Sequence, residues 1–270
     1  MKDFHIHTIY SDGEDNEFEI IEKIKDAGIK EFAICDHNII TGCKKVHDIL
    51  EKSNSDLIFH TGIEFTCRLA NYSPSLNMHI IVHDFDLDSK EINYLIDKYE
   101  GFKDIKLERM IKIVKKLYDF DIPEKDIIDV QKKTASIGKP HIYNILINYM
   151  DLSREQYYKD MDNLDTDDLK LDVLEVIEIS NKIGSKVVLA HPIEIMEDHG
   201  LTFDEIDKLV GYLKEKGLDS IETRHSKHNE EYYNKFHSMA IKYNLEESMG
   251  SDYHGYKVKP NVKLGKCYKE

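Results

Sequence analysis

The chain has 270 residues, 41% hydrophobic and 33% charged, so it can bury a core and does not have the composition of a disordered protein. Its 52 acidic residues outnumber 37 Lys and Arg, and the net charge of −15 disfavours binding of extended nucleic acid. It begins without the apolar stretch of a signal peptide and has no run of membrane-spanning length, so we expect a cytoplasmic protein with no membrane partner.

Short segments rich in Ile and Val alternate with segments of helical periodicity along the chain. The expected strands are 4–7, 32–35, 57–65, 78–85, 186–190, 219–223 and 246–250, and the expected helices are 16–27, 42–52, 172–183, 204–216 and 229–243. This alternation predicts an α/β protein with a mainly parallel sheet, either closed into a barrel or open and doubly wound.

Residues 89–171 show helical periodicity and no clear strand. We therefore expect a barrel built from residues 1–88 and 172–270, with 89–171 as a helical insertion between the fourth and fifth strands. Such an insertion could act as a lid over a site or could serve stability alone, and the sequence does not choose between these roles.

Histidine and carboxylate side chains recur where the expected strands end. They are His5, His7, Asp36, His37, Glu64, His79, His191, Asp252 and His254. Barrels gather their active-site groups around one rim, whereas an open sheet concentrates them at one switch point, so this distribution favours a barrel.

Four residues bear on metal binding. His5 and His7 are two residues apart on a strand, which places both rings on one face. Glu64 lies in an apolar run, where an unpaired carboxylate would cost several kcal/mol, so a cation or a salt-bridge partner is expected. Asp12, in the turn 11–13, adds a carboxylate above the first strand, although turn formation or helix capping alone would also explain it.

As an ordered series, seven segments resemble the PHP family of metal-dependent phosphoesterases, which includes histidinol phosphate phosphatases and nucleotide phosphatases. They are Phe4-His5-Ile6-His7-Thr8 with Ser11-Asp12-Gly13, Cys35-Asp36-His37-Asn38, Gly62-Ile63-Glu64, Met78-His79-Ile80-Ile81, Gly138-Lys139-Pro140-His141, Ala190-His191-Pro192 and Gly250-Ser251-Asp252-Tyr253-His254-Gly255. The resemblance implies a distorted seven-stranded (β/α) barrel that binds two or three divalent ions.

The resemblance also implies a set of ligands for each ion. His5, His7, Glu64 and Asp252 would hold the first, Asp12, His37 and His254 the second, and Glu64, His79 and His191 the third. This nitrogen and oxygen set suits Zn, Mn or Fe. The implied reaction is hydrolysis of a phosphate ester by a hydroxide held between two metals. Asp36 and His191 are the candidate catalytic groups, and the group that protonates the leaving oxygen stays open.

Phosphate oxygens that are not bound to metal need donors. The candidates are Arg68, Lys139, His141 and Arg224, with surface solvation or a helix cap as the alternative for each. Lys139 and His141 resemble the family's Gly-Arg-Pro-His segment, with Lys in place of Arg. His225 and His228 could also line the rim, and His83 is either a further site group or a structural residue.

We expect the substrate to be a small phosphorylated molecule or a nucleotide. A nuclease acting on longer nucleic acid is the first alternative, which the acidic balance opposes. A catalytically silent metal-binding module is the second, which the complete set of site residues opposes.

Overall fold

The computed structural model describes residues 1–53, 55–71, 75–131, 138–161, 164, 166 and 168–267. Contacts divide the chain into two compact units, Met1–Ile96 with Leu171–Glu270 and the intervening Asp97–Lys170. The first boundary falls inside the long helix α3 (Lys90–Tyr118).

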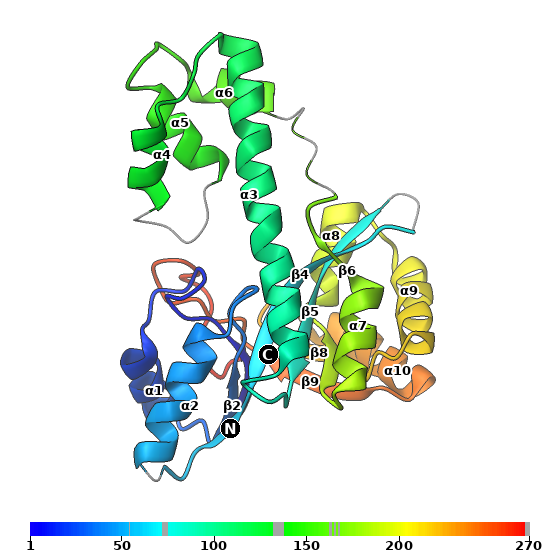
Figure 1. Cartoon of the computed structure of the whole chain (residues 1–270). Coiled ribbons are helices and arrows are strands. Elements are labelled where there is room, and N and C mark those ends of the chain that lie inside the picture. The colour runs from blue at the N-terminus through cyan, green and yellow to red at the C-terminus, as the bar shows by residue number, and fades with distance from the viewer. Residues whose placement is uncertain are drawn as a thin grey trace. The chain divides into compact units, whose positions relative to one another are not determined.

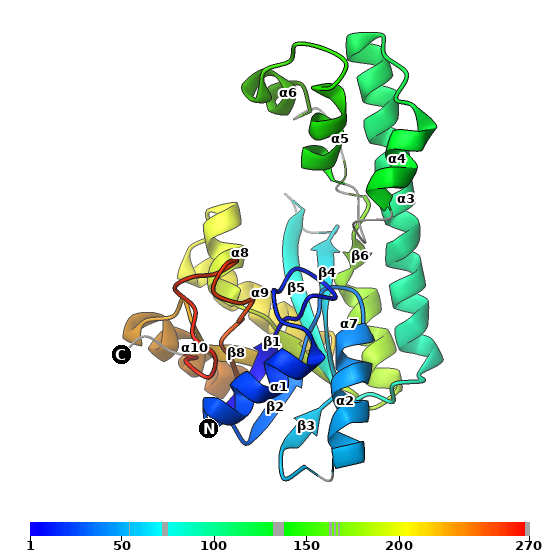
Figure 2. The same ribbon diagram turned by 90° about the vertical axis from the view of Figure 1, so that its left-hand side faces the viewer.

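The first unit contains two sheets (Figures 1 and 2). One is parallel, in the order β1 (Lys2–Ile6), β2 (Glu31–Ile34) and β3 (Ile58–His60). The other has the order β6 (Leu171–Asp172), β4 (Gly62–Leu69), β5 (Leu76–His83), β7 (Lys186–Leu189), β8 (Ser220–His225) and β9 (Glu246–Gly250). Only β5 runs antiparallel to its neighbours among these described strands.

The two sheets adjoin at two isolated parallel pairings, Ile6 with Tyr253 and His37 with Glu64. The fold is therefore mixed α/β with mostly parallel strands, as expected, and its polar strand ends are brought together from both sheets. A closed seven-stranded barrel stays a prediction.

Helices pack on the outside of these sheets. They are α1 (Glu17–Asp26), α2 (Thr41–Ser53), α7 (Val173–Lys182), α8 (Pro192–His199), α9 (Phe203–Glu215) and α10 (Glu230–Tyr243). In Figure 1, α1 and α2 lie beside the β1–β3 sheet, and the later helices lie beside the other sheet. The sequence determines where α1 starts, because Asn16 and Glu19 form a capping box that satisfies the first backbone N–H groups.

The second unit contains most of α3, with α4 (Glu124–Gln131), α5 (Lys139–Leu146) and α6 (Arg154–Met161). Its helices enclose their own apolar core around Met110, Val114, Ile142 and Tyr157. The regular elements described in this unit are all helices.

The expected strand 57–65 is instead two strands in different sheets. The chain changes sheets at Thr61, whose hydroxyl bonds to the backbone N–H and C=O of Phe85. Gly62 follows, and a Cβ there would lie 2.6 Å from the carbonyl oxygen of Ile34. The close approach of two backbones therefore produces a break that apolar periodicity does not reveal.

Two short elements were not predicted. Strand β6 has two residues, too few for a periodic signal, and α8 begins at Pro192 directly after the strand-end residue His191. Among the described residues, no helix combines the length and the apolarity needed to cross a membrane.

Candidate metal centre

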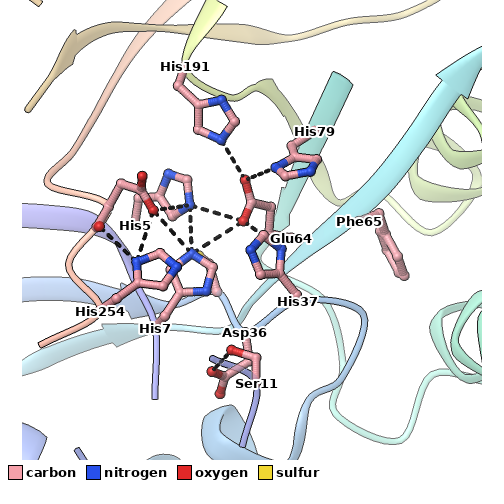
Figure 3. A network of polar contacts seen from close by, with 12 residues as sticks. His5, His7, Ser11, Asp36, His37, Glu64, Phe65, His79, His191 and His254 are labelled. Atoms are coloured by element: carbon pink, nitrogen blue, oxygen red, sulfur yellow. Dashed lines mark hydrogen bonds and ion pairs between the residues drawn. The ribbon is translucent and has the colours of Figure 1, made fainter. Parts of the chain in front are cut away.

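The nine side chains expected to bind metal lie in one cluster, part of which Figure 3 shows. They come from β1 and the turn after it, the end of β2, strands β4 and β5, the start of α8, and the loop after β9. Three overlapping groups each present ligand atoms within 4.8 Å of one another: His7, Asp12, His37 and His254; His5, His7 and Glu64; and His37, Glu64 and His79.

Glu64 is at the centre of the cluster and is fully buried. Its Oε1 lies 3.1 Å from Nδ1 of His79 and 2.9 Å from Nε2 of His191. Its Oε2 faces three more ring nitrogens at 3.0 to 3.3 Å, those of His5, His7 and His37. Both carboxylate oxygens are therefore surrounded by imidazoles, as Figure 3 shows.

Asp12 gathers a second group at the more exposed side of the cluster. Its Oδ1 lies 3.2 Å from Nε2 of His254 and 3.6 Å from Nδ1 of His7, and its Oδ2 lies 3.7 Å from Nε2 of His37. Nδ1 of His254 is 2.9 Å from the backbone oxygen of Asp252, which fixes this nitrogen as the donor and leaves Nε2 to face Asp12.

The turn that carries Asp12 is held by Asp36. This buried carboxylate accepts hydrogen bonds from the backbone N–H of Thr8 at 2.7 Å, the Thr8 hydroxyl at 2.6 Å and the Ser11 hydroxyl at 2.7 Å. Figure 3 shows Asp36 and Ser11 next to the imidazole cluster, with no contact drawn between them and the imidazoles. Asp36 thus shapes the turn that presents Asp12, and a direct role in the reaction stays a prediction.

Two residues of the cluster have positive φ angles, which are costly for residues other than Gly. His191 has φ 24° and Asp252 has φ 56°. Backbone strain of this kind, about 1–3 kcal/mol per residue, persists where surrounding contacts hold it and is typical of functional sites. Here Glu222 accepts the backbone N–H of His191 at 2.6 Å, and the backbone oxygen of His5 accepts that of Asp252 at 2.9 Å.

Burial and the neighbouring charges shift the pKa values of several residues in the cluster. Burial raises the pKa of Glu64, but the charges of His5 and His37 and other nearby imidazoles outweigh this effect and hold that pKa well below its ordinary value. Burial and repulsion by His37 lower the pKa of His7 to about 3, so its ring is neutral at pH 7 and can offer a lone pair. Burial lowers the pKa of His191, but Glu64 raises it to about 9.

The ligand atoms of the cluster are arranged for binding divalent cations and not for hydrogen bonding to one another. Nε2 of His5 lies 3.0 Å from Nε2 of His7. The other ring nitrogen of His5, Nδ1, lies 3.0 Å from Oε1 of Glu222. Glu64 Oε2, His7 Nδ1 and His37 Nδ1 are buried and form no hydrogen bond among the described residues, because the close ring nitrogens around Oε2 do not have hydrogen-bonding angles. Converging acceptor atoms of this kind are expected where cations of charge +2 belong, and imidazole with carboxylate suits Zn, Mn or Fe.

Glu222 and His225, on β8, were not among the expected ligands, yet both are fully buried against them. Glu222 Oε1 contacts His5, and Nε2 of His225 lies 3.4 Å from Oδ2 of Asp252. Opposing charge outweighs burial at Glu222 and lowers its pKa to about 2. Glu222 is flanked by Ser220, Ile221, Thr223 and Arg224 and belongs to none of the motifs, so the sequence did not single it out.

The four expected phosphate-binding residues divide between the two units. Arg224 stacks on the ring of Tyr233 in α10, 4.8 Å from the ring centroid, and donates to its hydroxyl. Arg68 shares the cluster face of β4 but lies four residues beyond Glu64, roughly 13 Å along the strand.

The other two belong to the second unit. Lys139 is the first residue of α5, and Nδ1 of His141 accepts the backbone N–H of Gly138 at 3.0 Å, which is a helix-capping contact. Substrate contact by any of the four residues stays a prediction.

His83 and His228 lie outside the set of nine. His228 Nδ1 bonds the backbone oxygen of Thr223 at 2.8 Å, and its ring packs on Phe236. His83 ends the antiparallel strand β5 and therefore lines a pocket of about 230 Å³ at the opposite ends of the strands, with the strand-starting residues Lys2 and Lys186.

No family model matches the chain. A 5'-3' exoribonuclease of Haemophilus influenzae is 23% identical over 93% of this chain and 89% of its own length. A phosphoribosyl 1,2-cyclic phosphate 1,2-diphosphodiesterase of Eggerthella lenta is 23% identical over 94% of each chain.

Two solved structures share the fold. A Bifidobacterium adolescentis protein assigned as a metal-dependent phosphoesterase superposes with a TM-score of 0.66 at 23% identity, over 98% of this chain and 91% of its own. A two-domain Bacteroides vulgatus protein containing a predicted PHP-like metal-dependent phosphoesterase has a TM-score of 0.50 at 13% identity, over 97% of this chain and 56% of its own.

Proposed function

Because this chain is similar to the PHP-like metal-dependent phosphoesterases in its motifs, its relatives and its fold, we propose that it hydrolyses phosphoric esters at the nine-residue cluster. The observation that carries the proposal is the convergence on Glu64. Five imidazoles meet one buried carboxylate, and one of its oxygens has no hydrogen-bond donor among the described residues.

We propose that Glu64 would be shared between cation sites. His5, His7 and Asp252 would hold a first cation with it, and His79 and His191 would hold a third. Asp12, His37 and His254 form the second site at the exposed edge. Divalent cations there, of Zn, Mn or Fe, would supply Lewis acidity to the phosphoryl group and lower the pKa of a water molecule.

The chain's own residues prepare this chemistry in three ways. Buried Glu222 fixes which nitrogen of His5 faces the cluster. Asp36 holds the turn that presents Asp12. His191 is placed on a strained backbone between Glu64 and Glu194, with Nδ1 3.2 Å from Oε2 of Glu194, and we propose that it also serves the proton transfer.

The substrate we propose is a small phosphorylated molecule or a nucleotide. The chain's net charge of −15 opposes long polyanions, whereas the positive charge of bound cations attracts a compact phosphate group. The curated relatives are named for a ribonuclease and for a cyclic phosphate diesterase, so diesters and short RNA belong in the assay beside monoesters.

Hydrolysis of 4-nitrophenyl phosphate and bis(4-nitrophenyl) phosphate tests the proposal. Metal-free protein is titrated with Mn²⁺, and a chelated sample and a Glu64→Gln variant serve as controls. Turnover that rises with Mn²⁺ and is lost in both controls supports the proposal. A panel of nucleotides, sugar phosphates, histidinol phosphate and 5'-phosphorylated short RNA then identifies the substrate class. No hydrolysis across the panel by metal-loaded protein favours the silent binding module.

A further inference from the structure

Lys259 reaches the cluster from a loop in which no ligand was expected. Its ammonium group donates to Oδ2 of Asp252, and its side chain is 33% exposed. The loop is ordered by a backbone hydrogen bond of 2.8 Å from Lys259 N–H to the oxygen of Gly255. A lysine that touches a buried metal-binding carboxylate while remaining open to solvent stands at the entrance of the site.

The two oxygens of Asp252 have different surroundings. Oδ1 faces the ring nitrogens of His5, His7 and His254, at 3.7, 3.5 and 3.3 Å. Oδ2 faces Lys259 and the buried ring of His225. Oδ1 is therefore the oxygen available to a cation, and Lys259 is anchored on the other side of the same carboxylate.

Of the Lys and Arg side chains described in the first unit, Lys259 contacts one of the nine side chains through its charged group. Arg224 is engaged with Tyr233, and Lys227 pairs with Glu194 and Glu197. An ammonium group has three N–H donors, and one of them is used at Asp252. Two donors remain for a further acceptor such as a phosphate oxygen.

We infer that Lys259 binds a phosphoryl oxygen of the substrate, with Asp252 holding its ammonium group in place. The inference rests on the proposed function and adds a positive side chain that contacts the cluster. It also assigns the loop 255–259 to substrate binding.

Binding of inorganic phosphate to Mn²⁺-loaded protein, measured by calorimetry, tests this role without relying on turnover. Lys259→Met removes the donors, Lys259→Arg keeps the charge, and Lys263→Met changes an exposed lysine of the same segment. Charge-assisted hydrogen bonds of ordinary strength predict that Lys259→Met weakens phosphate binding roughly 10- to 100-fold. Lys259→Arg should stay within about fivefold of wild type, and Lys263→Met should match it.

Metal content is measured in each sample, because Lys259 could act only by orienting Asp252. The inference is overturned if Lys259→Met binds phosphate as wild type does, or if its defect disappears once excess Mn²⁺ restores the wild-type metal content. With an active aryl phosphate substrate, the loss should fall mainly on KM. A wild-type protein that takes up no Mn²⁺ would refute the proposed function itself, whereas wild-type turnover with a neutral residue 259 would refute only this inference.

Discussion

Glu222 contacts two residues that belong to different proposed cation sites, one through its side chain and the other through its backbone. Its Oε1 lies 3.0 Å from Nδ1 of His5, and its Oε2 accepts the backbone N–H of His191 at 2.6 Å. All three residues are almost completely buried. One carboxylate therefore sets the tautomer of one ligand and holds the strained backbone of another.

Glu222→Gln should weaken cation binding. The amide can accept from only one of the two donors, so its NH₂ group faces either the His5 ring or the backbone N–H of His191. Loss of a hydrogen bond that orients a ligand typically costs 10- to 100-fold in metal affinity, and we expect a loss of about that size in a Mn²⁺ titration. Circular dichroism should remain that of wild type, and unchanged affinity would contradict this role.

Gly42→Ala should destabilise the protein although residue 42 is not part of the cluster. A Cβ at this position would lie 2.1 Å from Oδ2 of Asp36 and 2.5 Å from Oγ1 of Thr8. The carboxylate would have to move away from donors that it now satisfies, at a cost of roughly 2–4 kcal/mol. Thermal unfolding measures this loss. Gly101→Ala is the matched control, because a Cβ there meets nothing within 4 Å, and equal stability of both variants would contradict the account.

Removal of divalent cations should lower the unfolding temperature. A ligand at 100 times its Kd stabilises the native state by about 2.7 kcal/mol, which corresponds to roughly 5–10 °C for a unit of this size. Scanning calorimetry with Mn²⁺ and with a chelator gives the difference directly. Glu64→Gln should abolish most of it, and a full Mn²⁺-dependent shift in that variant would show that the cations bind elsewhere.

His83 should make the protein sensitive to mild acid. Burial lowers its pKa from 6.5 to about 4, so between these values the unfolded chain binds more protons than the folded one. The stability that depends on neutral His83 is therefore complete above pH 6.5 and is lost as the pH falls toward 4, by up to about 3 kcal/mol.

His83→Phe removes this group while keeping an aromatic ring near Phe4, and the neighbouring pocket leaves room for it. Denaturant unfolding at pH 7.5 and pH 5 should show a smaller loss of stability for the variant than for wild type. An equal loss in both proteins would exclude His83 as a source of the acid sensitivity.

The alternation of strands and helices could be predicted because several expected strands, such as 32–35 and 186–190, contain an apolar run. The structure confirms the α/β class, and the comparisons confirm the resemblance to PHP-like metal-dependent phosphoesterases. The change of sheet at Thr61 could not be predicted, since it depends on a hydrogen bond to Phe85, 24 residues later.

The site, too, could be predicted from the sequence only in part. His5, Glu64 and Asp252 lie in motifs and converge in the structure, whereas their roles as ligands stay predictions. Lys259 could not be found from the sequence, because its contact with Asp252 depends on how the last loop folds back. A lid formed by residues 89–171 stays a prediction as well.

The metal content of the purified protein tests the central claim most directly. Elemental analysis after incubation with Mn²⁺ and desalting should find two or three ions per chain in wild type and fewer in Glu64→Gln. A wild-type chain that retains no divalent ion would contradict the account, because the convergence of nine donor side chains would then serve some other purpose.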